Sequence, residues 1–281
     1  MQSLDEEVND IINDEELVDS EDEREAQEEQ KEKFDLQLTF TTLVPQLIRT
    51  ILVAPHGNAQ ALSKIILGHG LTGGDRLKEI GKVEVTYHEK TQEVLKILHY
   101  SGASEGQILV LHPQEALKST FVNQLVDKLF GQLKAEGAKF DRIVILDSIY
   151  KTNYSTTDTG YLTNLGDHYP LKYYRTSHAN ADQVLASFTS KIQPAGVLNL
   201  IGGLNAAILI HAELNGIPAA EFVSVVDSHY VTSETLQAFT PIVQEVLGFN
   251  EASANMNEIH RLAGFKEVLK EVNNRNNNIF N

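Results

Sequence analysis

One uninterrupted apolar run constrains the fold of this chain more than any other feature. Ile143 to Leu146 follow Arg142 with no polar residue among them. A continuous apolar run of this kind is typical of a parallel strand that is covered on both faces. The run therefore predicts a sheet with helices packed against both of its sides.

Short apolar runs and helical patterns alternate on either side of this strand. Further strands are predicted at residues 47–54, 82–87, 95–100, 108–111 and 220–226, and helices at 59–67, 117–133, 204–214, 232–247 and 262–272. This alternation indicates a three-layer α/β domain with a largely parallel sheet flanked by helices. The strands between residues 82 and 111 could form an antiparallel part of that sheet.

Residues 150–180 interrupt the alternation. This segment is rich in Thr, Tyr, Asn, Asp and His, and its composition predicts a long irregular connection. Long connections of this sort are usually functional or mobile. Regular structure is expected to resume at Val197.

The two ends of the chain differ in composition from the segment between them. Residues 1–33 hold 15 acidic and three basic residues, and they carry most of the net charge of −16. Such a segment predicts a disordered acidic tail. Residues 34–272 are then the single folded domain, and residues 273–281 a flexible Asn-rich tail that ends in two large apolar side chains, Ile279 and Phe280.

Composition excludes several classes of function. Outside the acidic tail the chain is nearly neutral, and it lacks the clustered Lys and Arg needed to bind nucleic acid. The absence of cysteine rules out thiolate catalysis and Cys-ligated metal sites. With no signal-peptide pattern and no run of 18 apolar residues, we expect a soluble intracellular protein without membrane insertion.

Three motifs resemble catalytic or metal-binding patterns but lack the required context. Residues 102–106 match G-x-S-x-G around Ser104, yet strands are predicted on both sides, whereas a nucleophile elbow needs a strand-to-helix turn. His88-Glu89 begins like H-E-x-x-H, but Gln92 stands where the second imidazole would be. Adjacent residues in Asp227-Ser228-His229 point apart. His211 lies on an apolar helix face and is expected to be a core residue. The sequence therefore predicts no catalytic site, no metal site and no cofactor.

Two glycine turns leave one alternative open. Gly68 to Gly74 and Gly202-Gly203 could expose backbone N–H groups to an anion. Neither has dinucleotide-binding or Walker A spacing, so turn and packing roles are favoured. The alternative function is an α/β enzyme that processes nucleosides or nucleotides, using one of these turns with a polar residue from the 150–180 segment.

Several segments resemble the proteasome assembly chaperone family. Gly203 to Ile210, followed by Leu214 to Ala220, is similar to the family's helix, then G-I-P-A, then strand. Residues 144–152, with the Ser/Thr-rich stretch that continues to Gly160, resemble the corresponding strand and loop, and residues 235–242 and 278–281 are also similar. These matches span roughly residues 140–281.

The resemblance implies a non-enzymatic chaperone with a nucleoside-phosphorylase-like topology. Such a protein would form a heterodimer with proteasome assembly chaperone 2, and would hold the α-subunit ring of the proteasome core particle during assembly. The expected location is the cytoplasm, with the nucleus or the endoplasmic reticulum as alternatives. Family members carry a C-terminal hydrophobic–Tyr–X motif that inserts between α subunits. It corresponds to Ile279, Phe280 and Asn281, with Phe in the place of Tyr.

The chemistry of this docking tail limits its affinity. Burial of Ile279 and Phe280 contributes about 1.5–3 kcal/mol each, and a terminal carboxylate that meets a Lys adds about 1.5–3 kcal/mol. Ordering a flexible tether offsets much of this gain. The tail alone is therefore expected to bind in the millimolar to high micromolar range. It becomes effective as a second contact beside a larger interface.

Overall fold

A nine-stranded sheet organises the part of the chain that the computed structural model describes. The described residues are 34–55, 57–70, 76–87, 89–102, 106–114, 119–156, 169–196, 198–228, 230–249, 259–261 and 264–279. The strand order across the sheet is β1-β3-β4-β5-β2-β6-β9-β7-β8. In chain order the strands are β1 Phe34–Phe40, β2 Leu47–Val53, β3 Leu77–Tyr87, β4 Lys90–Gly102, β5 Gly106–Pro113, β6 Lys139–Tyr150, β7 Leu171–Arg175, β8 Gln193–Pro194 and β9 Ala219–Val226.

The centre of the sheet is parallel. Strand β2 pairs in parallel with β5 and β6, and β6 pairs in parallel with β9. All eight residues of β9 are buried, as are Ile143, Val144 and Ile145 of β6. The prediction of a strand covered on both faces is confirmed for β6.

The sheet as a whole is mixed, which corrects the expectation of a largely parallel sheet. Strands β1, β3, β4 and β5 pair antiparallel in that order, and β7 pairs antiparallel with β9. The cause is the short connections, since β4 begins three residues after β3 ends and β5 begins four residues after β4 ends. Such turns permit only antiparallel pairing, because a parallel crossover needs a longer connection. The expected antiparallel part between residues 82 and 111 is confirmed.

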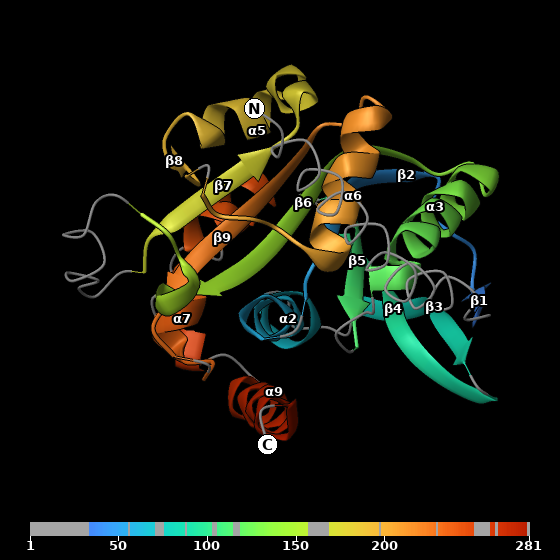
Figure 1. Ribbon diagram of the computed structural model, residues 1–281, viewed down its shortest axis with the longest axis horizontal. Helices are drawn as coiled ribbons and strands as arrows, with labels where there is room; N and C mark the ends of the chain where they lie inside the picture. The colour runs from blue at the N-terminus through green and yellow to red at the C-terminus, as the bar shows by residue number, and fades with distance from the viewer. Residues whose placement is uncertain are drawn as a thin grey trace, which may run out of the picture.

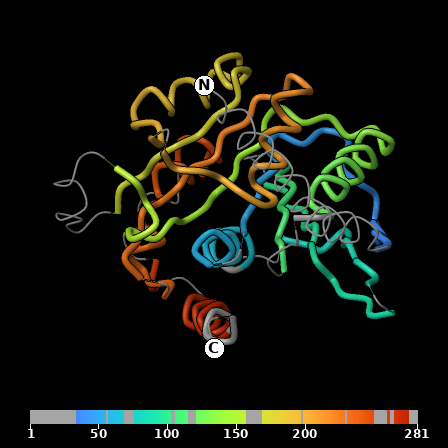
Figure 2. Tube along the Cα trace, in the orientation of Figure 1, coloured from blue at the N-terminus to red at the C-terminus, as the bar shows by residue number. Residues whose placement is uncertain are grey.

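Helices cover both faces of the sheet (Figure 1). One face carries α3 (Ser119–Ala135) and α6 (Gly203–Leu214). The other face carries most of the other helical segments, namely α2 (Asn58–Ser63), η1 (Lys64–Gly70), α5 (Gln183–Thr189), α7 (Ser233–Gln237), η4 (Ile242–Val246), η5 (Ile259–Arg261) and α9 (Phe265–Ile279). The expected three-layer α/β architecture is confirmed. Figure 2 shows α9 beside α2, although the two helices lie far apart in sequence.

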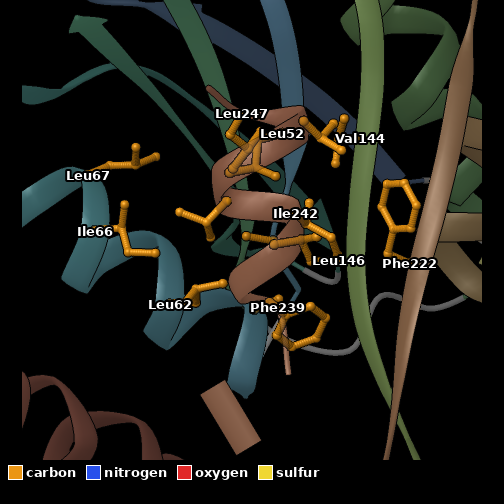
Figure 3. Packing of buried hydrophobic residues seen from close by; sticks show 14 of the residues in the cluster. Leu52, Leu62, Ile66, Leu67, Val144, Leu146, Phe222, Phe239, Ile242 and Leu247 are labelled. Carbon is orange, nitrogen blue, oxygen red and sulfur yellow. The ribbon is translucent and has the colours of Figure 1, made fainter. Parts of the chain in front are cut away.

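The first hydrophobic core lies on the α2 side of the sheet. Figure 3 shows Ile242 of η4, and Leu247 directly after η4, between Leu62 of α2 and Val144 of β6. These side chains are at most 4% exposed. The second core lies under α3 and α6, where Leu129 packs in the same cluster as Ile145.

Several elements differ from the sequence expectations. The 150–180 segment contains β7 and two short 3-10 turns, η2 (Lys151–Asn153) and η3 (Ser177–Ala181), while residues 157–168 lie outside the described residues. Helix α5 and strand β1 were not anticipated. The helix expected over residues 232–247 is divided into α7 and η4, with Pro241 immediately before η4.

The C-terminal helix is longer than expected. Helix α9 continues through Ile279, and so includes residues that the sequence assigned to a flexible tail beginning at Asn273. The predicted acidic tail, residues 1–33, lies outside the described residues. In the described part of the chain, no helix combines the length and apolar character required to cross a membrane.

Candidate protein-docking surface

The root of the predicted docking tail is fixed to the body. Asn273 of α9 makes two hydrogen bonds to the backbone of Val231, donating from Nδ2 to the carbonyl at 3.1 Å and accepting the N–H at Oδ1 at 2.9 Å. Glu271 accepts a hydrogen bond from Lys64 Nζ at 2.9 Å. Ile279 is the last residue of α9, and Phe280 and Asn281 lie outside the described residues. The helix that precedes Phe280 and Asn281 in the chain is therefore anchored to η1 and to the segment before α7.

The structure describes only part of the sequence motifs that resemble catalytic or metal-binding patterns. Gly102 and Gly106 face each other across β4 and β5, so the G-x-S-x-G segment joins two antiparallel strands. Ser104, His88 and His229 lie outside the described residues. The ring of His211 stacks on Phe130 with centroids 4.6 Å apart, and it lies half-buried between α6 and α3. Among the described residues, no group of three or more His, Cys, Asp or Glu could hold a metal ion.

Four large apolar side chains are exposed on and beside α6. Ile210 and Leu214 are 59% and 80% exposed, and they lie one above the other because residues four apart share a helix face. Leu198 and Leu200 are 67% and 89% exposed in the segment that leads into the helix. We call these four residues the α6 apolar surface. Ile210 and Leu214 share one helix face, and exposed apolar patches commonly mark sites of protein interaction.

A groove of about 720 Å³ adjoins the α6 apolar surface. Its walls come from β7, from the chain after β8 and from α6, where Ala206, Leu209 and Ile210 contribute. Two of its residues are charged, and both are engaged in the fold. Arg175 donates to Thr189 Oγ1 of α5 at 2.8 Å, and Glu213 accepts from the N–H and the hydroxyl of Ser177 at 2.7 and 2.6 Å.

The electrostatics of the groove suit an uncharged partner surface. The hydrogen bonds from Ser177 hold the pKa of Glu213 below its usual value, so this carboxylate is already ionised and paired at neutral pH. The groove lining is otherwise aromatic, aliphatic or small and polar. Desolvating such a surface costs less than desolvating unpaired charges.

A cluster of polar residues supports α6 from the sheet. Asn205, in the first turn of α6, donates from Nδ2 to Asp147 Oδ2 on β6 at 2.8 Å and to Glu221 Oε1 on β9 at 2.9 Å. Glu221 is fully buried and Asp147 partly so. Burial, followed by the charge of Asp147, raises the pKa of Glu221 to about 8. Burial also raises the pKa of Asp147 to about 6, against the lowering effect of its hydrogen bonds.

Solved structures of other proteins share this fold. PbaB of Pyrococcus furiosus, described as an archaeal proteasome activator, matches with a TM-score of 0.57 and 9% identity over 85% of this chain and 99% of that chain. PbaA of the same organism, described as an archaeal homologue of proteasome-assembly chaperone, matches with a TM-score of 0.55 and 11% identity over 85% of this chain and 92% of that chain. The chain has the fold of these archaeal proteins.

Other comparisons add little beyond the fold. A Thermoplasma acidophilum protein of unknown function matches with a TM-score of 0.52 and 13% identity over 82% of this chain and 88% of that chain. No family model matches the sequence, and no curated protein matches it. The structural likeness therefore stands on the arrangement of strands and helices rather than on shared residues.

Sequence reasoning missed the α6 apolar surface, although a signal for it was present. The 204–214 pattern is apolar on more than one side, since Ile210 and Leu214 accompany Leu204 and Ile208. A surface helix that is apolar nearly all round usually contacts something on each side. Glu221 offered a signal for the polar cluster under α6, because it is the one ionisable residue in a strand whose other residues, apart from Ser224, are apolar.

Proposed function

We propose that this protein is a non-enzymatic chaperone for assembly of the proteasome core particle. The observation that carries the proposal is the fold shared with an archaeal homologue of proteasome-assembly chaperone and with an archaeal proteasome activator. The sequence resemblance to the chaperone family over residues 140–281 supports the same function independently. The chain would stand in the position of proteasome assembly chaperone 1, with proteasome assembly chaperone 2 as its heterodimer partner.

The α6 apolar surface is the site proposed for the partner chaperone. Its four exposed apolar side chains and the adjoining groove, whose two charged residues are hydrogen-bonded within the fold, offer a mostly apolar face, which fits an apolar face on the partner chain. Apolar burial contributes about 25 cal/mol per Å² of surface removed from water. This contact would supply the larger interface that a weak docking tail needs.

Ile279, Phe280 and Asn281 are proposed to dock between α subunits of the proteasome. The anchoring of α9 through Asn273 and Glu271 supports this role, because it shortens the free segment that must be ordered on binding. Phe280 keeps the ring that Tyr would supply and lacks one hydroxyl hydrogen bond, which is worth about 0.5–1.5 kcal/mol. Docking is expected to be weaker than with Tyr, but retained.

The two contacts can be tested separately by co-purification. An N-terminally tagged protein from its own cells is compared with a variant lacking Ile279 to Asn281 and with the double variant Leu200→Ser/Leu214→Ser. The matched control is Leu43→Ser/Leu47→Ser, which removes two leucines that are 92% and 72% exposed elsewhere. A tag placed at the C-terminus should act like the truncation, because the free carboxylate is part of the contact.

Each outcome assigns one part of the proposal. The truncation should retain the partner chaperone and lose proteasome α subunits, whereas the α6 double variant should lose the partner chaperone. The Leu43/Leu47 control should behave like the unaltered protein. If the unaltered protein brings down neither a related chaperone nor α subunits, the proposed function is wrong.

A further inference from the structure

Two buried carboxyl groups meet beneath the first turn of α6. Asp147 comes from β6 and Glu221 from β9, and the single amide group of Asn205 donates one N–H to each of them. Asp147 Oδ1 also accepts the backbone N–H of Ser148 at 2.7 Å. Among the described residues no donor reaches Glu221 Oε2, although this atom is fully buried. An ionised Glu221 would therefore bury an oxygen that carries charge and has no hydrogen bond.

Among the described residues around the pair, no cation is recorded within ion-pair distance of either carboxyl group. The neighbouring titratable groups are the phenols of Tyr150 on β6, Tyr154 after η2 and Tyr174 on β7, each with its pKa raised by burial and, for Tyr150 and Tyr174, by the carboxyl groups. The basic residue on the same face of β7 is Lys172, whose Nζ donates to Gln193 Oε1 at 2.7 Å. Besides burial, the pKa of each carboxyl group is affected by the other carboxyl group and by the hydrogen bond from Asn205. The pKa of Asp147 is also lowered by the hydrogen bond from the Ser148 N–H.

We infer that Asp147 and Glu221 share a single proton at neutral pH, and that this protonated pair, bridged by Asn205, holds the first turn of α6 on the sheet. The proton lets Glu221 donate to Asp147, so the buried Oε2 gains a partner. The pair then carries one negative charge instead of two. Two adjacent carboxyls commonly resolve their repulsion by keeping one proton between them.

The first turn of α6 is packed on the core through Leu204, and this pair is the side-chain polar support that Asn205 gives it. The N-cap residue Gly202 provides no side-chain hydrogen bond, and Gly203 has a φ of +56°. Loss of the shared proton would place two repelling carboxylates under Asn205. The helix that carries Ile210 and Leu214 would then be less firmly held, and alkaline pH would weaken the α6 apolar surface. This last consequence for partner binding rests on the proposed function, whereas the shared proton does not.

The direction of the pH effect follows from proton linkage. Glu221 has a higher pKa in the fold, about 8, than the ordinary value of 4.5 that it regains on unfolding. The native state thus holds a proton that the unfolded chain has lost. The contribution of this proton to the free energy of unfolding is complete below pH 4.5, falls as the pH rises, and is gone above about pH 8.

The test is the pH dependence of unfolding of the full chain and of Glu221→Gln. Glutamine mimics the protonated carboxyl, since it presents an oxygen to Asn205 and an N–H to Asp147. Between pH 6 and 8, the unfolding constant of the unaltered protein should rise about tenfold per pH unit relative to that of Glu221→Gln. The control is Glu213→Gln. It removes a carboxylate of α6 whose pKa is lowered rather than raised, and it should leave this slope unchanged.

A second measurement needs no variant. Infrared spectroscopy of the unaltered protein should show one protonated carboxyl group at pH 7 that disappears as the pH passes about 8. A ratio of unfolding constants that stays constant between pH 6 and 8, or a spectrum without a protonated carboxyl at pH 7, would overturn the inference. Either result would leave the proposed chaperone function untouched, because co-purification does not depend on it.

Discussion

Asp182 joins one strand to one helix through a single carboxylate. Its Oδ1 accepts the N–H groups of Val184 and Leu185 at 2.9 Å and so caps α5. Its Oδ2 accepts a hydrogen bond from Arg142 Nε on β6 at 2.7 Å, and both side chains are 8% exposed. Arg142 also donates to the carbonyl of Val246 at 3.4 Å. The Arg142–Asp182 pair thus ties α5, β6 and the end of η4 together.

Replacing Asp182 by alanine should destabilise the fold strongly. The loss of an N-cap costs about 0.5–2 kcal/mol, and removing one partner of a buried ion pair costs about 3–5 kcal/mol because the other charge is left uncompensated. Denaturant unfolding should show that the free energy of unfolding falls by about 3–5 kcal/mol. Asp182→Asn keeps a capping oxygen and should lose less. If Asp182→Ala unfolds with the stability of the unaltered protein, the pair has no structural role.

Single residues differ in how far the sequence reveals their roles. The burial of Ile143 to Leu146 is legible from the run itself, because any strand of such residues must be covered. The sequence does not predict the hydrogen-bond partners of Asp182, Asn205 and Glu221, because these partners lie on other elements that only tertiary packing brings close. The motif around Ser104 illustrates the reverse case, because the strands predicted on both sides of it already argued against a nucleophile elbow, and the antiparallel pairing of β4 and β5 confirms those strands.

Among the elements, α9 has the clearest dependence on one contact. Phe265, Val268 and Val272 are buried on its inner side. Asn273 holds the helix against the body through hydrogen bonds to the N–H and the carbonyl of Val231. The helix also carries Ile279 at its end. The place from which the docking tail would emerge is therefore set by Asn273.

Asn273→Ala should loosen α9 without unfolding the sheet. The variant loses two hydrogen bonds, each worth about 0.5–1.5 kcal/mol, and the protection of α9 amides against hydrogen exchange should fall accordingly. Asn273→Asp keeps the acceptor for Val231 N–H and should lose about half as much. Exchange in β6 should be unaffected. Unchanged protection of α9 in Asn273→Ala would show that its apolar face alone holds it.

The boundaries of elements were less predictable than their existence. The strands and helices marked by clear periodicity are present, but α5, α7 and η4 are short and owe their limits to Asp182, Thr232 and Pro241. From periodicity alone, the sequence predicted one unbroken helix over residues 232–247, with Pro241 inside it. Strand β1 was missed because its alternating residues adjoin the acidic segment, and it forms only by pairing with β3.

Considered as a whole, the molecule has two cores that share their central strands. Strand β2 directs Leu52 to one core and Ile51 to the other, and β6 does the same with Val144 and Ile145. A strand cannot lose its packing on one face and keep its geometry for the other. The two cores are therefore expected to unfold together.

This coupling predicts a single transition for variants of either core. Leu129→Ala, in the α3 core, should cost about 2–5 kcal/mol, and Phe239→Ala, in the α2 core, about 3–5 kcal/mol. Both side chains are fully buried. Circular dichroism in the far and near ultraviolet should give coincident unfolding curves for both variants, with the exposed Leu43→Ala as an unaffected control. Separate transitions in either variant would show that the cores are independent.

The layered architecture could be predicted from the sequence, but the strand order could not. Alternation of strands and helices indicates a sheet with helices packed against it. The placement of β2 between β5 and β6, and of β1 at the edge beside β3, depends on pairings between distant residues that local patterns do not encode. For the site, the tail residues came from a resemblance, whereas the α6 apolar surface required the exposure of individual side chains.

The contact between α9 and the first helices bears on how the chain is synthesised. Helix α2 and η1 leave the ribosome before most strands of the sheet, and α9 follows after all of them. Until α9 arrives, the apolar side chains of α2 and η1 that it covers have no permanent neighbour on that side. Closure of this face is thus a late event in synthesis. A partly synthesised chain therefore exposes these apolar side chains of α2 and η1. The helix that carries Ile279 can pack against them only after the rest of the fold has formed.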